Sequence, residues 1–279
     1  MLACRNEQRG RQAEANIQEL LASTDGAGRV EFTQLDLSSL SSVQSFVVAF
    51  RASHDRLDLL INNAGVMAGP FARTVDGFET QFATNHLGHF VLTAKLFDML
   101  QRTPGEARVV NVSSMLHCYA WWFNEDDIMW GEYQYSNYLV YSDSKLCNLL
   151  FTHELDRRLR AHNVSGVAVV ACHPGSSATN LVANSEAMNA RGGQKLWTWL
   201  FNALNRGPFF QSQRMGALPT LYAATGPTVS SGDFYGPGGF MAAWGHPTLQ
   251  TPSAFCSSET AATKLWAFSE RLAGVEFNV

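Results

Sequence analysis

Apolar residues along this chain follow two different spacings, which alternate along the sequence and predict an alternation of strands and helices. Short apolar runs that end in polar or small residues predict strands at 1–4, 30–35, 57–61, 107–112, 164–172 and 234–235. Apolar residues recurring every three or four positions predict helices at 7–22, 41–52, 78–100, 138–160, 214–224 and 258–272. Regular strand–helix alternation favours an α/β fold, a doubly wound parallel sheet with helices on both faces.

Two of these segments carry a finer expectation. The run 57–61 is continuously apolar, which is typical of a strand buried on both faces of a parallel sheet. Ser41 stands where a side-chain oxygen could cap the helix that follows it. We therefore expect an internal strand at 57–61 and a helix beginning at Ser41.

Composition limits the class of protein. The 279 residues suffice for one α/β domain with a full core, and we expect a single domain over 1–279. A net charge of −4, with no basic run, gives no indication of nucleic-acid binding. Five scattered cysteines show neither metal-ligand spacing nor an even number, so we expect no metal and a reducing, cytoplasmic compartment. The chain contains no run of 18 apolar residues, so the sequence predicts no transmembrane helix.

The candidate chemistry centres on Tyr141 and Lys145. Residues four apart on a helix share a face, so the phenol and the ammonium should be neighbours. An adjacent positive charge lowers the pKa of a phenol and so prepares it for proton transfer. With 7 tyrosines and four lysines in the chain, this spacing is expected by chance only about 0.1 times. A half-buried ring beside a solvated amine is the structural alternative.

Further motifs stand before and after this pair in a fixed order. They are Asn62-Asn63-Ala64-Gly65, Asn85-His86-Leu87-Gly88-His89-Phe90, Asn111-Val112-Ser113-Ser114 and His173-Pro174-Gly175. Together with Tyr141 and Lys145 they resemble the short-chain dehydrogenase/reductase family over nearly the whole chain. The stretch 144–148 and Glu154-Leu155 with Arg157-Arg158-Leu159 look like the branch of retinol dehydrogenases and the WW-domain oxidoreductase.

The resemblance implies the catalytic roles. Tyr141 would donate a proton to the substrate oxygen in reduction and remove one in oxidation. Lys145 would lower the pKa of Tyr141 and bind the nicotinamide ribose. Ser114 would hold the carbonyl, with Ser113 as the alternative if the register differs by one residue. Asn85 would help to position a relay water, unless it is only a buried amide bound to a neighbouring backbone.

The resemblance also implies a nicotinamide cofactor. Asp36 would contact the adenine, or else merely cap a turn. Asn62, Ala64 and Gly65 would wall the adenosine, or form no more than a tight turn.

The remaining cofactor contacts concern the nicotinamide and the choice of cofactor. Pro174, Gly175 and Thr179 would meet the carboxamide of nicotinamide. Arg5 stands where the branch places a positive charge against a 2′-phosphate, which favours NADP over NAD. A solvated surface arginine is an equal alternative for Arg5.

One family motif has no counterpart in this sequence. Family members begin with a strand and a Thr-Gly-x-x-x-Gly-x-Gly turn that binds the pyrophosphate. This chain begins about where the second strand should end, so we expect a fold without the first strand. We expect it to bind NADP weakly and to be less stable than an extended version.

Aromatic residues are the sequence feature that indicates the chemical class of the substrate. They are concentrated in 115–137 and 180–212, where they could cover the mouth of the site or pack as core. A lipophilic carbonyl or alcohol, such as a retinoid, steroid or aliphatic aldehyde, is the resulting expectation. Two other readings stay open: another reductase branch, and a non-catalytic product acting through protein contacts. A peripheral membrane contact and an oligomer are compatible with the sequence.

Overall fold

Seven strands form two sheets in the part of the chain that the computed structural model describes, residues 1–23, 26, 28–120, 123, 132, 135–176 and 211–279. The smaller sheet pairs β1 (Leu2–Cys4) with β2 (Phe32–Gln34) in parallel. The larger has the order β3-β4-β5-β6-β7. Its strands are β3 (Leu59–Asn62), β4 (Ala107–Val112), β5 (Val167–Cys172), β6 (Phe234–Pro237) and β7 (Pro247–Leu249). The pairs from β3 to β6 are parallel, whereas β7 is antiparallel and was not predicted.

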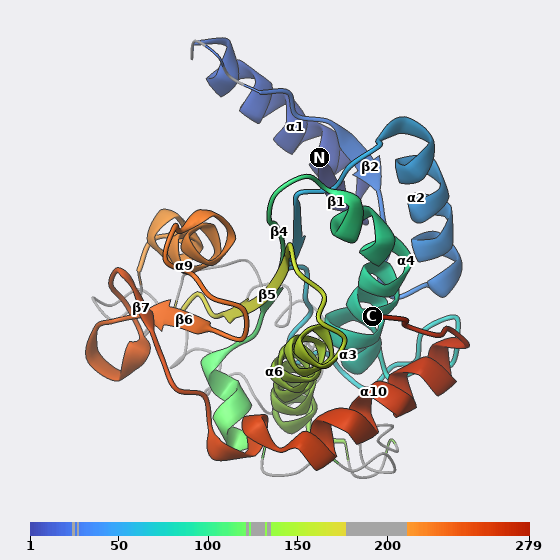
Figure 1. The fold of residues 1–279 in the computed structure, drawn as a ribbon, viewed down its shortest axis with the longest axis vertical. Coiled ribbons are helices and arrows are strands. Elements are labelled where there is room, and N and C mark those ends of the chain that lie inside the picture. Colours follow the sequence, from blue (N-terminus) through green and yellow to red (C-terminus); the bar gives the residue numbers. More distant parts are fainter. Residues whose placement is uncertain (24–25, 27, 121–122, 124–131, 133–134, 177–210) are drawn as a thin grey trace.

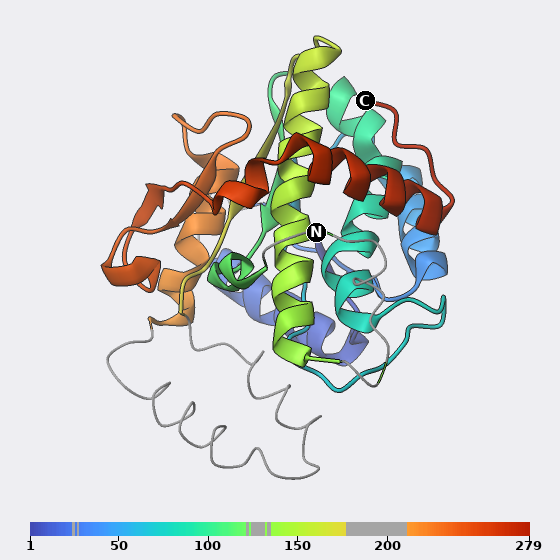
Figure 2. The same cartoon turned by 90° about the horizontal axis from the view of Figure 1, so that it is seen from below.

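Helices cover both faces of the larger sheet, as the alternation predicts. The longer helices are α1 (Glu7–Ala22), α2 (Leu40–Ser53), α4 (Gly88–Arg102), α6 (Asn137–Ala161), α9 (Gln213–Thr225) and α10 (Glu259–Ala273). In Figures 1 and 2, α6, α4 and α2 lie on one side of the sheet with α10 across them, and α9 lies on the other. Short helical turns are α3 (Thr80–Phe82), the π-helical turn Ala83–Leu87, and the 3-10 turns Met115–Tyr119, Phe240–Ala242 and Ala254–Ser257.

Alternate residues of the central strands supply the two cores. Val109 of β4 and Val169 of β5 belong to the core shared with α2, α4 and α6. Val110 and Val170 point the opposite way and pack with Ala223 of α9. All four valines are fully buried, as expected for strands that are covered on both faces.

The strand predicted at 57–61 differs from expectation. It was predicted to be buried on both faces, but Leu59 and Ile61 are 39% and 40% exposed, so this prediction was wrong for one face. Leu60, which points the other way, packs against the core. The physical reason is that, among the described residues, no strand pairs with the outer edge of β3 and no helix covers this face. The expected absence of a strand between β1 and β3 is confirmed within the same residues.

Two of the predicted helices need correction, one in its cap and one in its continuity. Ser39, not Ser41, caps α2, because its side chain accepts a hydrogen bond from the Ser42 amide. The helix predicted at 78–100 is interrupted by the π-helical turn that contains Asn85. A π turn carries one extra residue per turn and often marks a functional site.

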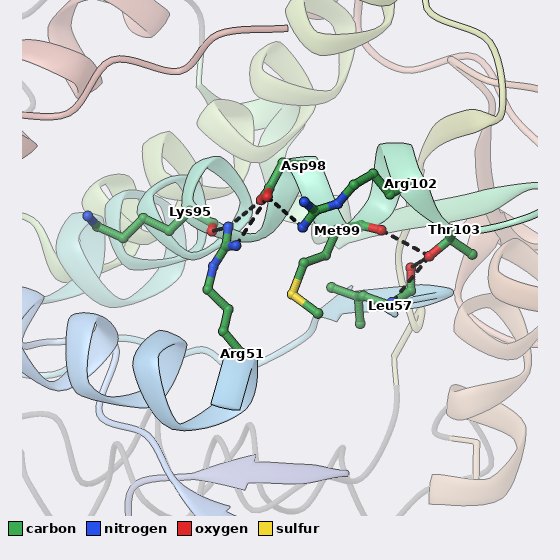
Figure 3. A network of polar contacts seen from close by, with 7 residues as sticks. All are labelled: Arg51, Leu57, Lys95, Asp98, Met99, Arg102 and Thr103. Carbon is green, nitrogen blue, oxygen red and sulfur yellow. Dashed lines mark hydrogen bonds and ion pairs between the residues drawn. The ribbon is translucent and has the colours of Figure 1, made fainter. Parts of the chain in front are cut away.

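Polar contacts join α2 to α4 at the molecular surface (Figure 3). The guanidinium of Arg51 reaches across to an ion pair with Asp98 and donates to the carbonyl of Lys95 at 2.6 Å. Arg102, one turn beyond Asp98, binds the same carboxylate at 2.8 Å. The hydrogen bond between Arg51 and Asp98 is the main cause that lowers the pKa of the Asp98 carboxyl. The pair is half exposed, so solvent screening limits its contribution to stability to about 1 kcal/mol or less.

No helix among the described residues is long and apolar enough to cross a membrane.

Candidate active site

The motifs singled out in the sequence meet at one edge of the larger sheet. Asn62 ends β3, Ser113 follows β4, and His173 follows β5. Because these strands are parallel, their carboxyl ends lie together, which is where open α/β sheets bind ligands. Arg5 and Asp36 follow the strands of the smaller sheet instead.

Helix α6 carries Tyr141 and Lys145 to this edge. Both side chains are buried, and Lys145 Nζ lies 5.8 Å from the centroid of the Tyr141 ring. The Ser114 hydroxyl lies close to the phenol of Tyr141 and acts to lower its pKa. A serine hydroxyl, a phenol and an ammonium therefore converge from β4 and α6, as the sequence predicts.

The two candidate serines have different partners. Ser113 Oγ is buried and donates to the backbone carbonyl of Lys145 at 2.8 Å. Ser114 Oγ contacts Tyr141 and accepts from the amide of Leu116 at 3.2 Å. The geometry thus favours Ser114 for a role beside the phenol, and Ser113 anchors α6 to β4.

Burial sets the protonation states of the pair. Burial raises the pKa of Tyr141 to about 12, against the opposing effect of the neighbouring Ser114 hydroxyl. Burial also lowers the pKa of Lys145 to about 8. The expected lowering of the Tyr141 pKa is therefore not seen, because removal from water outweighs the effect of the neighbouring Ser114 hydroxyl. Tyr141 is neutral at pH 7 and can donate its proton.

A second residue of α6 helps to fix Lys145, and sequence reasoning missed it. Lys145 Nζ and Asn148 Nδ2 each donate to the carbonyl oxygen of Val112, both at 3.0 Å. Val112 ends β4, immediately before the two serines. The signal was present in the spacing, because Asn148 lies one turn beyond Lys145 on the same helix face.

Asn85 is fully buried and holds the loop after β3. Its Oδ1 accepts from the amide of Val66 at 2.8 Å, and its Nδ2 donates to the carbonyl of Val66 at 2.9 Å. Nδ2 also donates to Ser144 Oγ at 2.9 Å. This is the arrangement of the structural alternative, a buried amide bound to a neighbouring backbone. The relay-water role is untested by these contacts.

Gly65 allows this close approach. A Cβ at Gly65 would lie 3.2 Å from Asn85 Oδ1 and 3.4 Å from Lys145 Nζ. A larger residue would push on the catalytic lysine and on the amide that holds the loop. The small residue predicted here for cofactor binding therefore also has a packing reason.

The other predicted adenosine contacts have identified partners or are exposed. Asn62 is buried and donates to Thr93 Oγ1 at 3.0 Å and to Asn111 Oδ1 at 2.8 Å. Ala64 lies exposed beside it. Asp36 Oδ1 accepts from the amide and hydroxyl of Ser38, which is the turn-capping alternative.

Arg5 is exposed and lies directly after β1. Its backbone carbonyl accepts from Gln34 Nε2 at 3.1 Å, which ties the residue to the end of β2. The side chain is thus free to serve as a surface charge or as a contact for a bound phosphate, and the two alternatives stay open.

The loop after β5 is held by His173, which belongs to a motif found in the sequence but was given no role there, and by Gln211, which was not selected. His173 Nδ1 accepts from the amide of Gly175 at 3.1 Å, and its Nε2 pairs with Gln250 at 2.8 Å. Gln211 donates to the carbonyl of Pro174 at 2.6 Å. Gly175 has φ of +64°, and a Cβ there would meet the carbonyl oxygen of Ala243 at 2.5 Å, so glycine is required. Thr179 lies outside the described residues.

No group of three or more His, Cys, Asp or Glu side chains could hold a metal ion among the residues with described positions. Cys172, at the end of β5, is fully buried, and burial raises the pKa of its thiol to about 12. A neutral core thiol is the consequence.

Comparisons with known proteins agree with this geometry. The family model described as short chain dehydrogenase matches residues 1–125. Human retinol dehydrogenase 13 is 35% identical over 99% of this chain and 77% of its own length. Human retinol dehydrogenase 11 is 37% identical, covering 98% of this chain and 77% of that protein.

Solved structures are similar as well. A crystal structure of an uncharacterized protein from Mycobacterium Paratuberculosis aligns with a TM-score of 0.71 and 38% identity, over 99% of this chain and 84% of that one. A Burkholderia phymatum short chain dehydrogenase/reductase in complex with NAD has a TM-score of 0.57 at 20% identity, over 80% and 75% of the two chains, and shows the shared fold.

These relationships define the class. The chain belongs to the short-chain dehydrogenase family, in its retinol-dehydrogenase-like branch, and is an oxidoreductase.

Proposed function

We propose that this protein interconverts an alcohol and a carbonyl with NADP as the cofactor, and that its substrate is lipophilic. The observation that carries the proposal is the convergence of Ser114, Tyr141 and Lys145 at one sheet edge. The names of the retinol dehydrogenases to which the chain is similar support the retinoid among the proposed substrates, which also include a steroid or an aliphatic aldehyde.

The protein's own groups would handle the proton. Tyr141 is protonated at pH 7, since its pKa is raised to about 12, and would give that proton to the carbonyl oxygen in reduction. Ser114 lies beside Tyr141 and would donate to the same oxygen as it gains charge. Lys145, fixed at 3.0 Å from the Val112 carbonyl, supplies a positive charge that stabilises the phenolate left behind.

The residues at the sheet edge fit a nicotinamide cofactor on the nicotinamide side. Gly65 leaves room beside Lys145 Nζ, where a Cβ would stand only 3.4 Å away. Gly175 and Pro174 present a backbone loop fixed by His173 and Gln211. Lys145 would bind the ribose, and Pro174 with Gly175 the carboxamide. When bound, the nicotinamide ring supplies or accepts the hydride.

Arg5 is the residue proposed to select NADP. It follows β1 and is exposed, so its guanidinium is accessible to a phosphate group. Arginine binds phosphate through charge-assisted, bidentate hydrogen bonds, which an unphosphorylated ribose cannot match.

The apolar substrate class rests on aromatic residues of 115–137 and 180–212. Of these, Tyr119 is exposed, and Phe123 packs edge-on against Phe268. Phe123 therefore fits the alternative that part of the insert packs as core. Tyr135 is half-buried and its hydroxyl donates to Glu79. The remaining aromatic positions, including Trp197 and Phe210, lie outside the described residues.

The direct test is turnover of all-trans-retinal, a steroid ketone and a medium-chain aldehyde with NADPH and with NADH. We expect reduction of at least one of them, with NADPH preferred. Activity with polar carbonyls alone would contradict the substrate class, and NADH preference would contradict the cofactor. The non-catalytic alternative is not favoured, because the catalytic side chains converge.

A further inference from the structure

A buried polar cluster next to the active site has no place in the proton-transfer chemistry. It consists of Glu79, Gln81, Tyr135 and Asn137, here called the Glu79 cluster. Glu79 is 0% exposed and Gln81 is 2% exposed. Buried polar groups of this kind are costly unless they are paired, so their partners show what the cluster holds in place.

Glu79 caps the helical segment that leads to Asn85. Its carboxylate accepts from the amides of Gln81 at 2.9 Å and Phe82 at 2.6 Å. It also accepts from the hydroxyl of Tyr135 at 2.9 Å. Burial raises the pKa of the Glu79 carboxyl, and these hydrogen bonds act in the opposite direction. A residue from just before α6 is thereby tied to the start of α3.

Gln81 joins the same two segments to a third. Its Nε2 donates to Tyr135 Oη at 2.8 Å and to the carbonyl of Asn137 at 3.0 Å. Its Oε1 accepts from the amide of Ala68 at 2.8 Å. Asn137 Nδ2 donates to the carbonyl of Ala68 at 3.1 Å. Both backbone polar groups of Ala68 are therefore bound by side chains of the cluster.

Ala68 is strained in this position. It is 1% exposed and has φ of +51°, a conformation that disfavours a residue with a Cβ. Such strain persists only where surrounding contacts enforce it, and it is frequent near functional sites. The hydrogen bonds from Gln81 and Asn137 hold both backbone polar groups of Ala68 in this conformation.

The segments held together each lead into the active site. Asn137 begins α6 one turn before Tyr141. Ala68 lies two residues after Val66, whose backbone Asn85 binds. The cluster therefore fixes the start of the Tyr141 helix relative to the loop that borders Lys145 at Gly65.

We propose that Glu79, Gln81, Tyr135 and Asn137 are positioning residues for the reaction, which set the place of Tyr141 by holding Ala68 in its strained conformation. The proposal rests on the proposed function for its catalytic consequence. Its structural part, the clamping of α6 to residues 66–68, stands independently of which substrate is used.

Two single substitutions test the cluster. Gln81→Ala removes the bonds to Ala68, Tyr135 and Asn137, and Tyr135→Phe removes only the hydroxyl while the ring stays edge-on to Phe71 at 5.4 Å. We expect kcat for carbonyl reduction to fall about 10-fold or more, with the KM for NADPH changed less than about 2-fold. Tyr138→Phe, at the exposed Tyr138 of the same helix, is the matched control and should leave kcat unchanged.

A second-site change separates positioning from mere stability. Glycine adopts positive φ freely, so Ala68→Gly removes the tendency of the loop to relax when Gln81 is lost. The double variant Ala68→Gly/Gln81→Ala should recover kcat to within about 3-fold of Ala68→Gly alone. No recovery, or a loss that follows the fall in Tm across the variants, would overturn the positioning role.

Hydrogen–deuterium exchange tests the clamp without turnover. In the full chain, Gln81→Ala should speed exchange in 64–68 and 137–145 at least 10-fold and leave α10 unchanged. Equal exchange in wild type and variant, or faster exchange everywhere, would overturn the clamp. If Gln81→Ala shows this pattern but the wild-type protein reduces no carbonyl, the proposed function fails while the clamp stands.

Discussion

Lys145 lies with its Nζ 5.8 Å from the centroid of the Tyr141 ring, and its hydrogen bond goes to Val112 rather than to the phenol. The lysine is therefore held by the end of β4, and its action on the phenolate belongs to the proposed function. Tyr141 in turn has its hydroxyl beside Ser114. Tyr141 therefore carries the proton to be transferred, and Lys145 carries the positive charge.

Tyr141→Phe should abolish turnover in a cofactor-competent form of the protein and leave NADPH binding nearly unchanged. The substitution removes the proton donor and little volume, and general acid–base catalysis contributes about 10²–10⁴-fold. Steady-state rates and NADPH titration measure the two effects, with Tyr138→Phe as the control. More than a tenth of wild-type activity in Tyr141→Phe would show that another group donates the proton.

Arg5→Ala should weaken NADPH binding much more than NADH binding. A hydrogen bond to a charged group contributes about 1.5–3 kcal/mol, and only NADPH carries the 2′-phosphate. Dissociation constants of both cofactors in wild type and variant decide this. An equal loss for both would leave Arg5 as a general surface charge, and Arg9→Ala, one turn further along, is the matched control.

A version of the chain extended by a first strand and glycine-rich turn should bind NADPH more tightly and unfold at higher temperature than the 279-residue chain. Among the described residues β1 and β3 are each paired on one side only, and Leu59 and Ile61 are exposed. A central strand burying four large side chains at about 2 kcal/mol each contributes roughly 8 kcal/mol. That is comparable to the whole stability of a typical domain, about 5–15 kcal/mol.

Thermal unfolding of both forms, with and without NADPH, tests this. The strand and the turn should improve stability and binding together, because the turn adds the amides that bind pyrophosphate. A short form that unfolds cooperatively and is stabilised normally by NADPH would contradict the prediction.

Acidification should destabilise the protein between pH 6.5 and about 4. Burial lowers the pKa of His86 to about 3, and that of His89 and of His173 to about 4. The unfolded chain binds more protons than the folded one in this window, so stability is lost as pH falls, at about 1.4 kcal/mol per pH unit for each histidine.

Urea unfolding at pH 7, 6 and 5 measures this slope. His86→Gln should flatten it by the contribution of one histidine, whereas replacement of the exposed His246 should leave it unchanged. A free energy of unfolding that stays constant from pH 7 to 5 would mean that these histidines titrate normally.

Much of the fold follows from patterns that are local in the sequence. Strand β4 and helix α6 could be predicted because their apolar spacing and the Tyr141–Lys145 pair lie within single elements. The exposure of Leu59 could not, because it depends on which element covers β3 in space rather than on residues near Leu59. Strand β7 was missed because its three residues, Pro247–Leu249, are too few to show an alternating apolar pattern.

The candidate site divides in the same way. Ser114 and Tyr141 were selected from motifs, and the structure brings them together. The direction of the Tyr141 pKa shift was missed, because the burial of a phenol depends on residues that are distant from it in the sequence. Asn148 and His173 stand in motifs found in the sequence, but their roles were missed, because these come from the carbonyls and amides that folding places next to them.

Transfer of deuterium from NADPH labelled at the nicotinamide C4 tests the central claim most directly. After reaction with a lipophilic aldehyde such as all-trans-retinal, the account predicts an alcohol one mass unit heavier, with label on the former carbonyl carbon. Tyr141→Phe should form none, while Tyr138→Phe should form as much as wild type. Unlabelled alcohol, no alcohol with any carbonyl offered, or equal labelling by Tyr141→Phe would contradict the assignment of this chain as a Tyr141-dependent alcohol–carbonyl oxidoreductase.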